Sequence, residues 1–195
     1  TSRAVTGVFA TGGTVNAMTF TPDGSNLLAV ETLSSAVEIF DQAGTQIGSP
    51  IALSANPNAI AVTPDGTTAY VSATYQNEII EIDLTTRAQT QHSVMMLPNR
   101  LAVSPDGQEL WVPLMGAGQV QVFSLPTFTA QVAVPVIGGP SLVTFAPGTD
   151  IALNIPRFEA GLCYPNEGLG FGIELNEAFL VSNKTAGKDG FVLEL

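Results

Sequence analysis

A Pro-Asp-Gly turn recurs at an almost constant interval along this chain, and this regularity is the strongest constraint on its fold. The tripeptide begins at Pro22, Pro64 and Pro105, and a Pro-Gly remnant begins at Pro147, so successive copies are 42, 41 and 42 residues apart. The residues before each turn repeat as well, in the forms NAMTFTPDG, NAIAVTPDG, NRLAVSPDG and SLVTFAPG. Proline fixes φ early in such a turn and glycine supplies a positive φ, so each copy predicts a tight chain reversal.

Each repeat unit predicts four short β-strands. In the second unit, NAIAV precedes the turn, YVSA and EIIEID follow it, and the more polar AQTQHSVMM leads to the next unit. These runs are β-branched or alternate between apolar and polar residues, and helical periodicity is not evident. Four-stranded units at this period are typical of a β-propeller, in which blades pack face to face around a central channel.

The repeats therefore predict an all-β, single-domain β-propeller of about five four-stranded antiparallel blades. The units are expected at residues 15–56, 57–97, 98–138, 139–168 in shortened form, and 169–195 together with 1–14. TSRAVTGVF at the N-terminus resembles the outermost strand of a unit, and GFVLEL at the C-terminus resembles a third strand. Residues 3–10 are thus predicted to pair with residues 190–195 and close the last blade, which removes a free sheet edge. Alternatively, the missing strand comes from a second copy of the chain, and the terminal strands then mediate self-association.

Equivalent apolar positions in the units are predicted to form the core between blades. One set is Met18, Ile60, Leu101 and Leu142, and another is Phe20, Val62, Val103 and Phe145. The residues that open the second strand, Leu28, Tyr70 and Trp111, are expected at one common height. Alternation along the strands places each set on a single face of its sheet.

Composition excludes several classes of function. The formal net charge is −11, from 17 acidic residues against six basic ones, and the cations are not clustered, so nucleic acid is not expected as a partner. No apolar run is long enough for a transmembrane segment. The single cysteine, Cys163, excludes an internal disulfide and any site with several thiolates. Richness in Thr, Ser, Gly and Ala with few Lys favours an exported protein, extracellular or at the cell surface.

The repeat resembles the YVTN-type propeller family, in which a Pro-Asp-Gly turn precedes a Tyr-Val-Thr-Asn strand and a Val-Ile-Asp strand. The similarity is strongest from Pro57 to Asp83 and covers roughly residues 1–150, whereas the irregular segment 155–170 has no counterpart in the repeats. The resemblance implies one of two kinds of protein. Some members are lactonases and cyclases acting on organic acids, and others are surface-layer or receptor-type binding modules without chemistry.

The candidate ligand-binding residues are Arg100 and a repeated asparagine. Asn16, Asn58 and Asn99 share one repeat position, so their amides are expected to form a partial ring near one end of the channel. Such a ring offers hydrogen bonds to a sugar or carbonyl oxygens to Ca²⁺, although each Asn alternatively caps the turn entering its own strand. Arg100 stands where the other units have Ala17, Ala59 and Ser141, and it is expected either to bind an anionic ligand or to be a solvated or structurally paired residue.

No catalytic residue is predicted. His92 is expected on an outermost strand, Cys163 has no neighbouring base in the sequence, and Asn183-Lys184-Thr185 matches a glycosylation acceptor pattern. No resident cofactor or metal site is expected, with Ca²⁺ as the one candidate ion. The leading hypothesis is a non-enzymatic extracellular or cell-surface module for binding or assembly, with a protein or carbohydrate partner. The alternative hypothesis is a lactonase- or cyclase-like enzyme acting on an organic acid or sugar lactone at the channel mouth.

Overall fold

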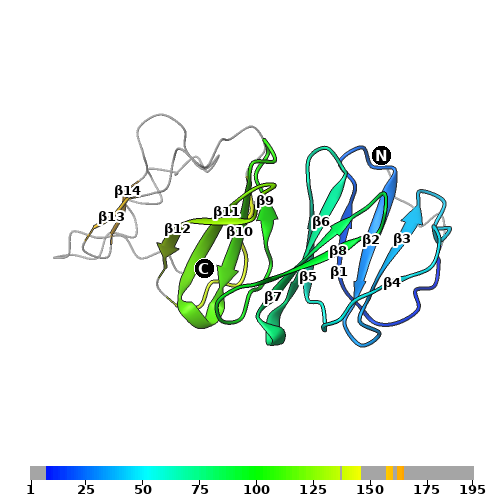
Figure 1. Cartoon of the computed structure of the whole chain (residues 1–195), viewed down its shortest axis with the longest axis horizontal. Coiled ribbons are helices and arrows are strands. Elements are labelled where there is room, and N and C mark those ends of the chain that lie inside the picture. Colours follow the sequence, from blue (N-terminus) through cyan, green and yellow to red (C-terminus); the bar gives the residue numbers. More distant parts are fainter. Residues whose placement is uncertain (1–7, 137, 146–156, 160–161, 165–195) are drawn as a thin grey trace, which may run out of the picture. The chain divides into compact units, whose positions relative to one another are not determined.

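The computed structural model describes residues 8–136, 138–145, 157–159 and 162–164 (Figure 1). The chain divides into two compact units, residues 1–144 and 145–195. In the second unit the described residues form an antiparallel pair, β13 (Arg157–Glu159) and β14 (Leu162–Tyr164). Cys163 lies in β14, and Asn183-Lys184-Thr185 lies outside the described residues.

Three four-stranded antiparallel sheets make up the first unit and lie side by side in chain order (Figure 1). Blade 1 contains β1 (Val15–Phe20), β2 (Asn26–Glu31), β3 (Ala36–Asp41) and β4 (Ile51–Ala52). Blade 2 contains β5 (Ala59–Val62), β6 (Thr68–Ala73), β7 (Glu78–Asp83) and β8 (Gln89–Ser93). Blade 3 contains β9 (Ala102–Val103), β10 (Glu109–Leu114), β11 (Gln119–Ser124) and β12 (Thr129–Pro135). Short 3₁₀ turns, η1 (Thr74–Gln76) and η2 (Met115–Ala117), precede β7 and β11. In each blade every strand pairs with the next one along the chain, so the all-β prediction of four-stranded antiparallel units is confirmed.

The Pro-Asp-Gly turns are fixed by their own side chains. In blade 1 the Thr21 hydroxyl donates to Asp23 Oδ1 at 2.6 Å, and the same oxygen accepts the Ser25 backbone N–H at 3.0 Å. The turn closes with a bond from the Gly24 N–H to the Thr21 carbonyl at 2.8 Å, and Gly24 has φ +70°. Blades 2 and 3 repeat this network around Asp65 and Asp106.

The turns also connect one blade to the next. A Cβ on Gly66 would lie 3.6 Å from Pro22 Cδ, and a Cβ on Gly107 would lie 3.3 Å from Pro64 Cδ. Both glycines have φ +73°, which disfavours any other residue. The proline of each turn therefore packs on the glycine of the following turn, whereas nothing lies within 4 Å of a Cβ on Gly24.

Two apolar clusters form the core and join the blades. One contains Val30 and Val37 of blade 1 with Ile80 and Ile82 of blade 2, and the other contains Tyr70 of blade 2 with residues of blade 3. Leu28, Tyr70 and Trp111 pair across their sheets with Thr19, Ala61 and Ala102 and are all buried. Their burial is therefore confirmed, and the three residues have equivalent registers in their sheets, as expected for a common height.

The predicted burial is wrong for three of the equivalent apolar residues. Ile60 and Leu101 are buried, and Val62, Val103 and Phe145 are partly buried, but Met18, Phe20 and Leu142 are exposed by 63%, 60% and 58%. Their counterparts Ile60 and Leu101 pack towards the preceding blade. No described sheet precedes blade 1, so the same face of β1 is left open. Leu142 lies in a short segment outside the three sheets, where one bridge joins it to Arg100.

The predicted closure of the ring involves mainly residues outside the described part of the chain, namely 3–7 and 190–195. Residues 8–10 are described and form no strand. The Phe9 ring instead packs on Phe40 of blade 1, with 4.8 Å between the ring centroids. The limits of the later units, the number of blades and the closing strand pair stay predictions.

Candidate ligand-binding site

The three repeated asparagines form a continuous hydrogen-bonded row across the blades. Asn16 Nδ2 donates to Asn58 Oδ1 at 2.8 Å and to the Asn58 carbonyl at 2.6 Å, and Asn58 Nδ2 donates to Asn99 Oδ1 at 2.8 Å. These bonds run from each blade to the next, so the side chains of Asn16 and Asn58 act between units and do not cap the turns of their own units. We call Asn16, Asn58 and Asn99 the amide row.

Backbone contacts hold the row at the start of the inner strands. The Asn58 N–H donates to the Ser72 carbonyl at 2.7 Å, and the Asn99 N–H donates to the Pro113 carbonyl at 3.0 Å. The loop between the second and third strands adds a hydroxyl to each site, because Thr32 donates to the Pro57 carbonyl and Thr74 to the Pro98 carbonyl, both at 2.7 Å. The residue before each of these asparagines is therefore tied to the preceding blade.

The amide row has a direction. Each amide donates its N–H to the next amide oxygen, so the dipoles align from Asn16 towards Asn99 and reinforce one another. Asn99 Nδ2, at the end of the row, has no acceptor among the described residues. The row therefore ends in N–H groups that remain available to an oxygen atom of a ligand.

Arg100 follows this donor end directly and is exposed. Its backbone pairs with the segment at residues 141–143, through the bonds from its N–H to the Ser141 carbonyl and from the Val143 N–H to its carbonyl. Its guanidinium has no ion pair or hydrogen bond with a described side chain. A charged guanidinium and a polarised amide donor at consecutive positions in the chain both favour a carboxylate or a polarised carbonyl as ligand.

The described residues do not fit a Ca²⁺ site at the row. No three His, Cys, Asp or Glu side chains in the described part gather to hold a metal ion. The Asn58 and Asn99 side-chain oxygens, which the sequence offered as ion ligands, accept amide N–H groups instead. The row thus presents donors at its Asn99 end.

Two buried glutamates near the row were not anticipated from the sequence. Glu31 and Glu38 of blade 1 are only 1% and 3% exposed. The Gly13 N–H donates to Glu31 at 2.7 Å and the Gly12 N–H donates to Glu38 at 3.1 Å. Both carboxylates lie within 3.5 Å of the position that a Cβ on Gly12 would occupy, so they help to fix this glycine pair against the open face of blade 1. The signal in the sequence was a charged residue at an apolar repeat position, since Glu31 of blade 1 stands where blades 2 and 3 have Ala73 and Leu114.

His92 lies away from the amide row, on the outermost strand β8 as predicted. Its Nε2 is 2.7 Å from Glu81 Oε2, and its ring stacks on Phe128 of blade 3 with centroids 3.8 Å apart. Burial and the nearby Glu81 raise the pKa of the Tyr70 phenol, which belongs to the same group of side chains. This cluster joins blades 2 and 3 at their outer part.

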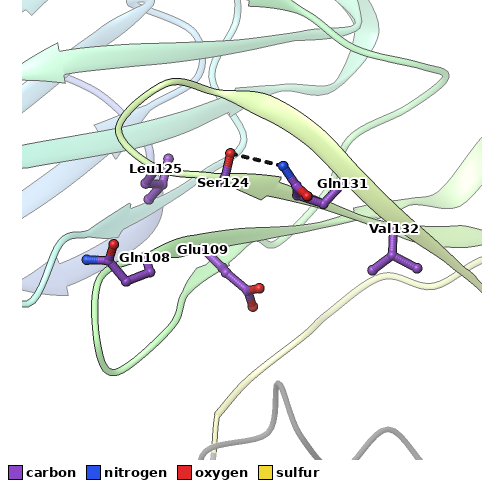
Figure 2. Close-up of a pocket in the computed structure, with 6 residues that line it drawn as sticks. All are labelled: Gln108, Glu109, Ser124, Leu125, Gln131 and Val132. Atoms are coloured by element: carbon purple, nitrogen blue, oxygen red, sulfur yellow. Dashed lines mark hydrogen bonds between the residues drawn. The ribbon is translucent and has the colours of Figure 1, made fainter.

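Figure 2 shows an open depression on blade 3, lined by Gln108, Glu109, Ser124, Leu125, Gln131 and Val132. Gln131 Nε2 donates to Ser124 Oγ at 3.2 Å, and Glu109 accepts the Trp111 indole N–H at 2.8 Å. Glu109 and Ser124 pair at the end of β10 and β11 opposite to Leu114 and Gln119. The depression therefore lies at the other end of blade 3 from the amide row.

Comparison with solved structures shows the fold. The chain resembles hydrazine synthase of Kuenenia stuttgartiensis, with a TM-score of 0.65 and 24% identity over 74% of this chain and 43% of the other. A streptogramin B lyase (TM-score 0.56, 20% identity, 66% and 43% covered) and the WD40 repeats of RRP9 (0.57, 12%, 65% and 40%) are also similar. The chain thus spans less than half the length of these structures. No curated protein matches its sequence, and no helix among the described residues is long and apolar enough to cross a membrane.

A match to a family model identifies the family of the repeats. The model described as SMP-30/Gluconolactonase/LRE-like region matches residues 51–152, which include blades 2 and 3 and two of the three asparagines of the amide row. The match covers more than half of the sequence and agrees with the propeller architecture of the similar structures. The chain therefore belongs to the SMP-30/gluconolactonase/LRE-like family of β-propellers.

Proposed function

We propose that this chain binds a cyclic ester, or the hydroxy acid formed from it, at the Asn99 end of the amide row, as part of a lactone-hydrolysing propeller. The observation that supports this most directly is the pair of donors at that end, Asn99 Nδ2 and the Arg100 guanidinium, which have no side-chain acceptor in the described part of the chain. Membership of a family that includes gluconolactonase favours a lactone over other carbonyl compounds.

The donors suit the charge changes of lactone hydrolysis. Water adds to the ring carbonyl carbon, negative charge develops on the carbonyl oxygen, and the ring C–O bond then breaks. One proton of the water passes to the leaving ring oxygen to form the hydroxyl group, and the other is released to solvent, which leaves the carboxylate. Preorganised N–H donors stabilise that developing charge most when they need not reorient during the reaction. Asn99 is held in this way by Asn58 and by the Pro113 carbonyl. Arg100 then pairs with the carboxylate of the product.

The proposal is tested by measuring hydrolysis of glucono-δ-lactone and of alkyl δ-lactones, with and without added divalent cations. Asn99→Ala and Arg100→Gln are each expected to lower kcat/KM by at least about tenfold, as loss of a charge-stabilising donor does. Arg87→Gln is the matched control, since it removes the same charge at the outer edge of the blades, where Arg87 donates to the Ile47 and Ser49 carbonyls. No hydrolysis of any lactone by the folded chain would overturn the proposal.

The second candidate function is a non-enzymatic binding or assembly module, extracellular or at the cell surface. This function is favoured because no base is offered by the two glutamates near the row. Glu31 and Glu38 are buried and already accept hydrogen bonds, so neither is available to activate water. A protein or carbohydrate partner, or self-association through the terminal strands, belongs to this proposal. Binding without turnover, together with recovery of the protein from the medium or the cell surface, would favour it over hydrolysis.

We also infer that the repeats are of the YVTN type within the broader propeller family. The phrase from Pro57 to Asp83 supports this, since it forms the inner three strands of blade 2 in the predicted order. A sequence comparison of the second strand across relatives tests it, because YVTN-type units should share the aromatic-Val start seen in Tyr70-Val71 and Trp111-Val112.

A further inference from the structure

All four methionines of the chain are exposed, although methionine is usually a core residue. Met18 lies on the open face of blade 1, whereas the other three lie at the end of blade 3 that carries Asn99. Their exposed fractions are 58% for Met95, 57% for Met96 and 39% for Met115. We call Met95, Met96 and Met115 the methionine lip.

The lip has a defined backbone. Leu97 adopts a left-handed conformation, with φ +56°. Its backbone N–H donates a hydrogen bond to Asn77 Oδ1 at 2.8 Å. The Met115 N–H donates to the Leu97 carbonyl at 3.1 Å, and the Gly116 N–H donates to the Met96 carbonyl at 3.3 Å. A left-handed non-glycine residue persists only where surrounding contacts hold it. These contacts therefore fix the backbone that carries Met96 and Met115.

Close approaches of the backbone bring the segments that carry the three methionines to one end of blade 3. A Cβ on Gly116 would lie 2.9 Å from Met96 Cβ, a separation too short for a side chain at position 116 without a shift of its neighbour. A Cβ on Gly139 would lie 2.8 Å from Met115 Cγ, which places the next segment of the chain against the lip. Gln119 Nε2 reaches Met95 Sδ at 3.8 Å from the start of β11.

The lip and the donor end of the amide row lie at the same end of blade 3. Met96 and Arg100 are four residues apart, a separation that spans at most about 14 Å even in a fully extended chain. An antiparallel β-bridge joins Pro98 to Leu114, and the Asn99 N–H donates to the Pro113 carbonyl. Residues 98–99 therefore run beside the end of β10, which leads directly to Met115. Leu142, whose backbone bridges to Arg100, is exposed and adds a fourth apolar side chain at this end of blade 3.

We infer that the site takes an amphipathic anion, with its carboxylate or ester carbonyl at Asn99 and Arg100 and an alkyl chain over the methionine lip. This rests on the proposed function and narrows its substrate to lactones that carry an apolar chain. A sugar lactone exposes hydroxyl groups that need hydrogen-bond partners, which thioethers supply only weakly. Unbranched methionine side chains adapt to flexible apolar ligands and suit an alkyl chain.

The test uses the 195-residue chain labelled with ¹³C-methyl methionine, because its four methyl signals separate the lip from Met18. Sodium octanoate is expected to shift the signals of Met95, Met96 and Met115 in a saturable way and to leave Met18 unchanged. Sodium gluconate is the polar control and 1-octanol is the uncharged apolar control, and both are expected to bind at least about tenfold more weakly than octanoate.

Variants separate the two halves of the site. The double variant Met95→Gln/Met96→Gln is expected to weaken octanoate binding about tenfold while leaving acetate binding unchanged. Arg100→Gln is expected to weaken both carboxylates. Met18→Gln is the matched control for loss of an exposed methionine and should change neither.

The outcomes distinguish the inference from the proposed function. Octanoate binding at the lip without hydrolysis of δ-decalactone or glucono-δ-lactone would support the inference and overturn the enzymatic proposal. Hydrolysis of glucono-δ-lactone without octanoate binding would do the reverse. Equal shifts of all four methionine signals, or equal affinity for octanoate and gluconate, would overturn the inference, since neither result requires a site at the lip.

Discussion

Trp111 combines burial with a specific hydrogen bond, and it is the largest side chain at its repeat position. It is 7% exposed, and its indole N–H donates to Glu109 at 2.8 Å. Trp111→Ala is expected to lower the free energy of unfolding by about 3–5 kcal/mol, since truncation of a buried aromatic residue leaves a cavity. Urea denaturation measures this, with Tyr75→Ala as the control because Tyr75 is 82% exposed. A loss below about 1 kcal/mol for Trp111→Ala would contradict the alignment of the units.

The direction of the amide row gives a prediction at Asn58. In Asn58→Asp the new carboxylate still accepts from Asn16 but has no N–H for Asn99 Oδ1, so two oxygens face each other. The free energy of unfolding at neutral pH is expected to fall by about 1–3 kcal/mol. Asn56→Asp is the matched control. Asn56 is exposed, and its side chain accepts a hydrogen bond from the Ser35 hydroxyl at 2.8 Å without donating one to a described residue. Equal stability of the two variants would show that the row does not depend on its N–H groups.

Sequence reasoning found the amide row but not its chemistry. Equivalent positions in a repeat come together by symmetry, so the grouping of Asn16, Asn58 and Asn99 followed from spacing alone. Whether each amide bonds its own turn or the next blade depends on side-chain geometry, which spacing does not contain. Glu31 and Glu38 were missed for the converse reason, because they break the repeat and are covered by Gly12 and Gly13, which belong to no strand.

Among the structural elements, the Pro-Asp-Gly turns should make stability depend on pH. Hydrogen bonds, first from the Thr21 hydroxyl and then from Ser25, lower the pKa of Asp23 to about 2, and similar bonds lower the pKa of Asp65 and Asp106. A carboxyl whose pKa is lower in the folded state contributes stability above its unfolded pKa of about 3.9 and loses it as pH falls towards the folded value. The turns should therefore lose their contribution between about pH 4 and pH 2.

Urea unfolding at pH 5, 4, 3 and 2 tests this dependence. The triple variant in which Asp23, Asp65 and Asp106 become Asn removes the three titrating groups and is expected to show a shallower loss of stability below pH 4 than the natural sequence. Replacing Glu78, which takes part in no such turn, by Gln provides the control for charge. Identical slopes for the triple variant and the natural sequence would contradict the role of the turn carboxylates.

The connection between blades 2 and 3 depends on Phe128, which stacks on both His92 and Phe123. Phe128→Ala is expected to cost about 1–3 kcal/mol of stability, from lost apolar burial and ring stacking. Thr127→Ala, one residue earlier in the same exposed turn, should change little. Amide hydrogen exchange of β8 and β12 reports whether stability is lost where Phe128 joins blades 2 and 3. Unchanged protection of both strands in Phe128→Ala would contradict this role of Phe128.

At the scale of the whole molecule, the sequence predicted blades more reliably than the ring. Strands and turns follow from local patterns, so the four-stranded antiparallel sheets could be predicted. Closure depends on contacts between distant segments, and the exposed Met18 and Phe20 belong to blade 1, which no described sheet precedes. The repeat pattern specifies which face is apolar but not what covers that face.

Ring closure within one chain can be tested by crosslinking. In a Cys163→Ser background, Val5→Cys and Leu193→Cys place one thiol in each predicted closing strand. Oxidation is expected to give an internally crosslinked monomer, seen by its mobility on a non-reducing gel and by its mass. A crosslinked dimer would instead support closure between two copies, and no crosslink would contradict both arrangements of the terminal strands.

The proline-on-glycine contact between successive turns has a consequence for how such a chain can change in length. The second unit supplies both partners of the contact, since Pro64 packs on Gly107 while Gly66 receives Pro22. A duplicated unit would therefore meet its neighbours through surfaces that already fit, and loss of a unit would leave matching surfaces behind. Gly24, with no neighbour within 4 Å, has the conformation to receive a proline from a further unit. The contact thus makes the number of units a property that gene duplication can alter while the geometry of each junction is kept.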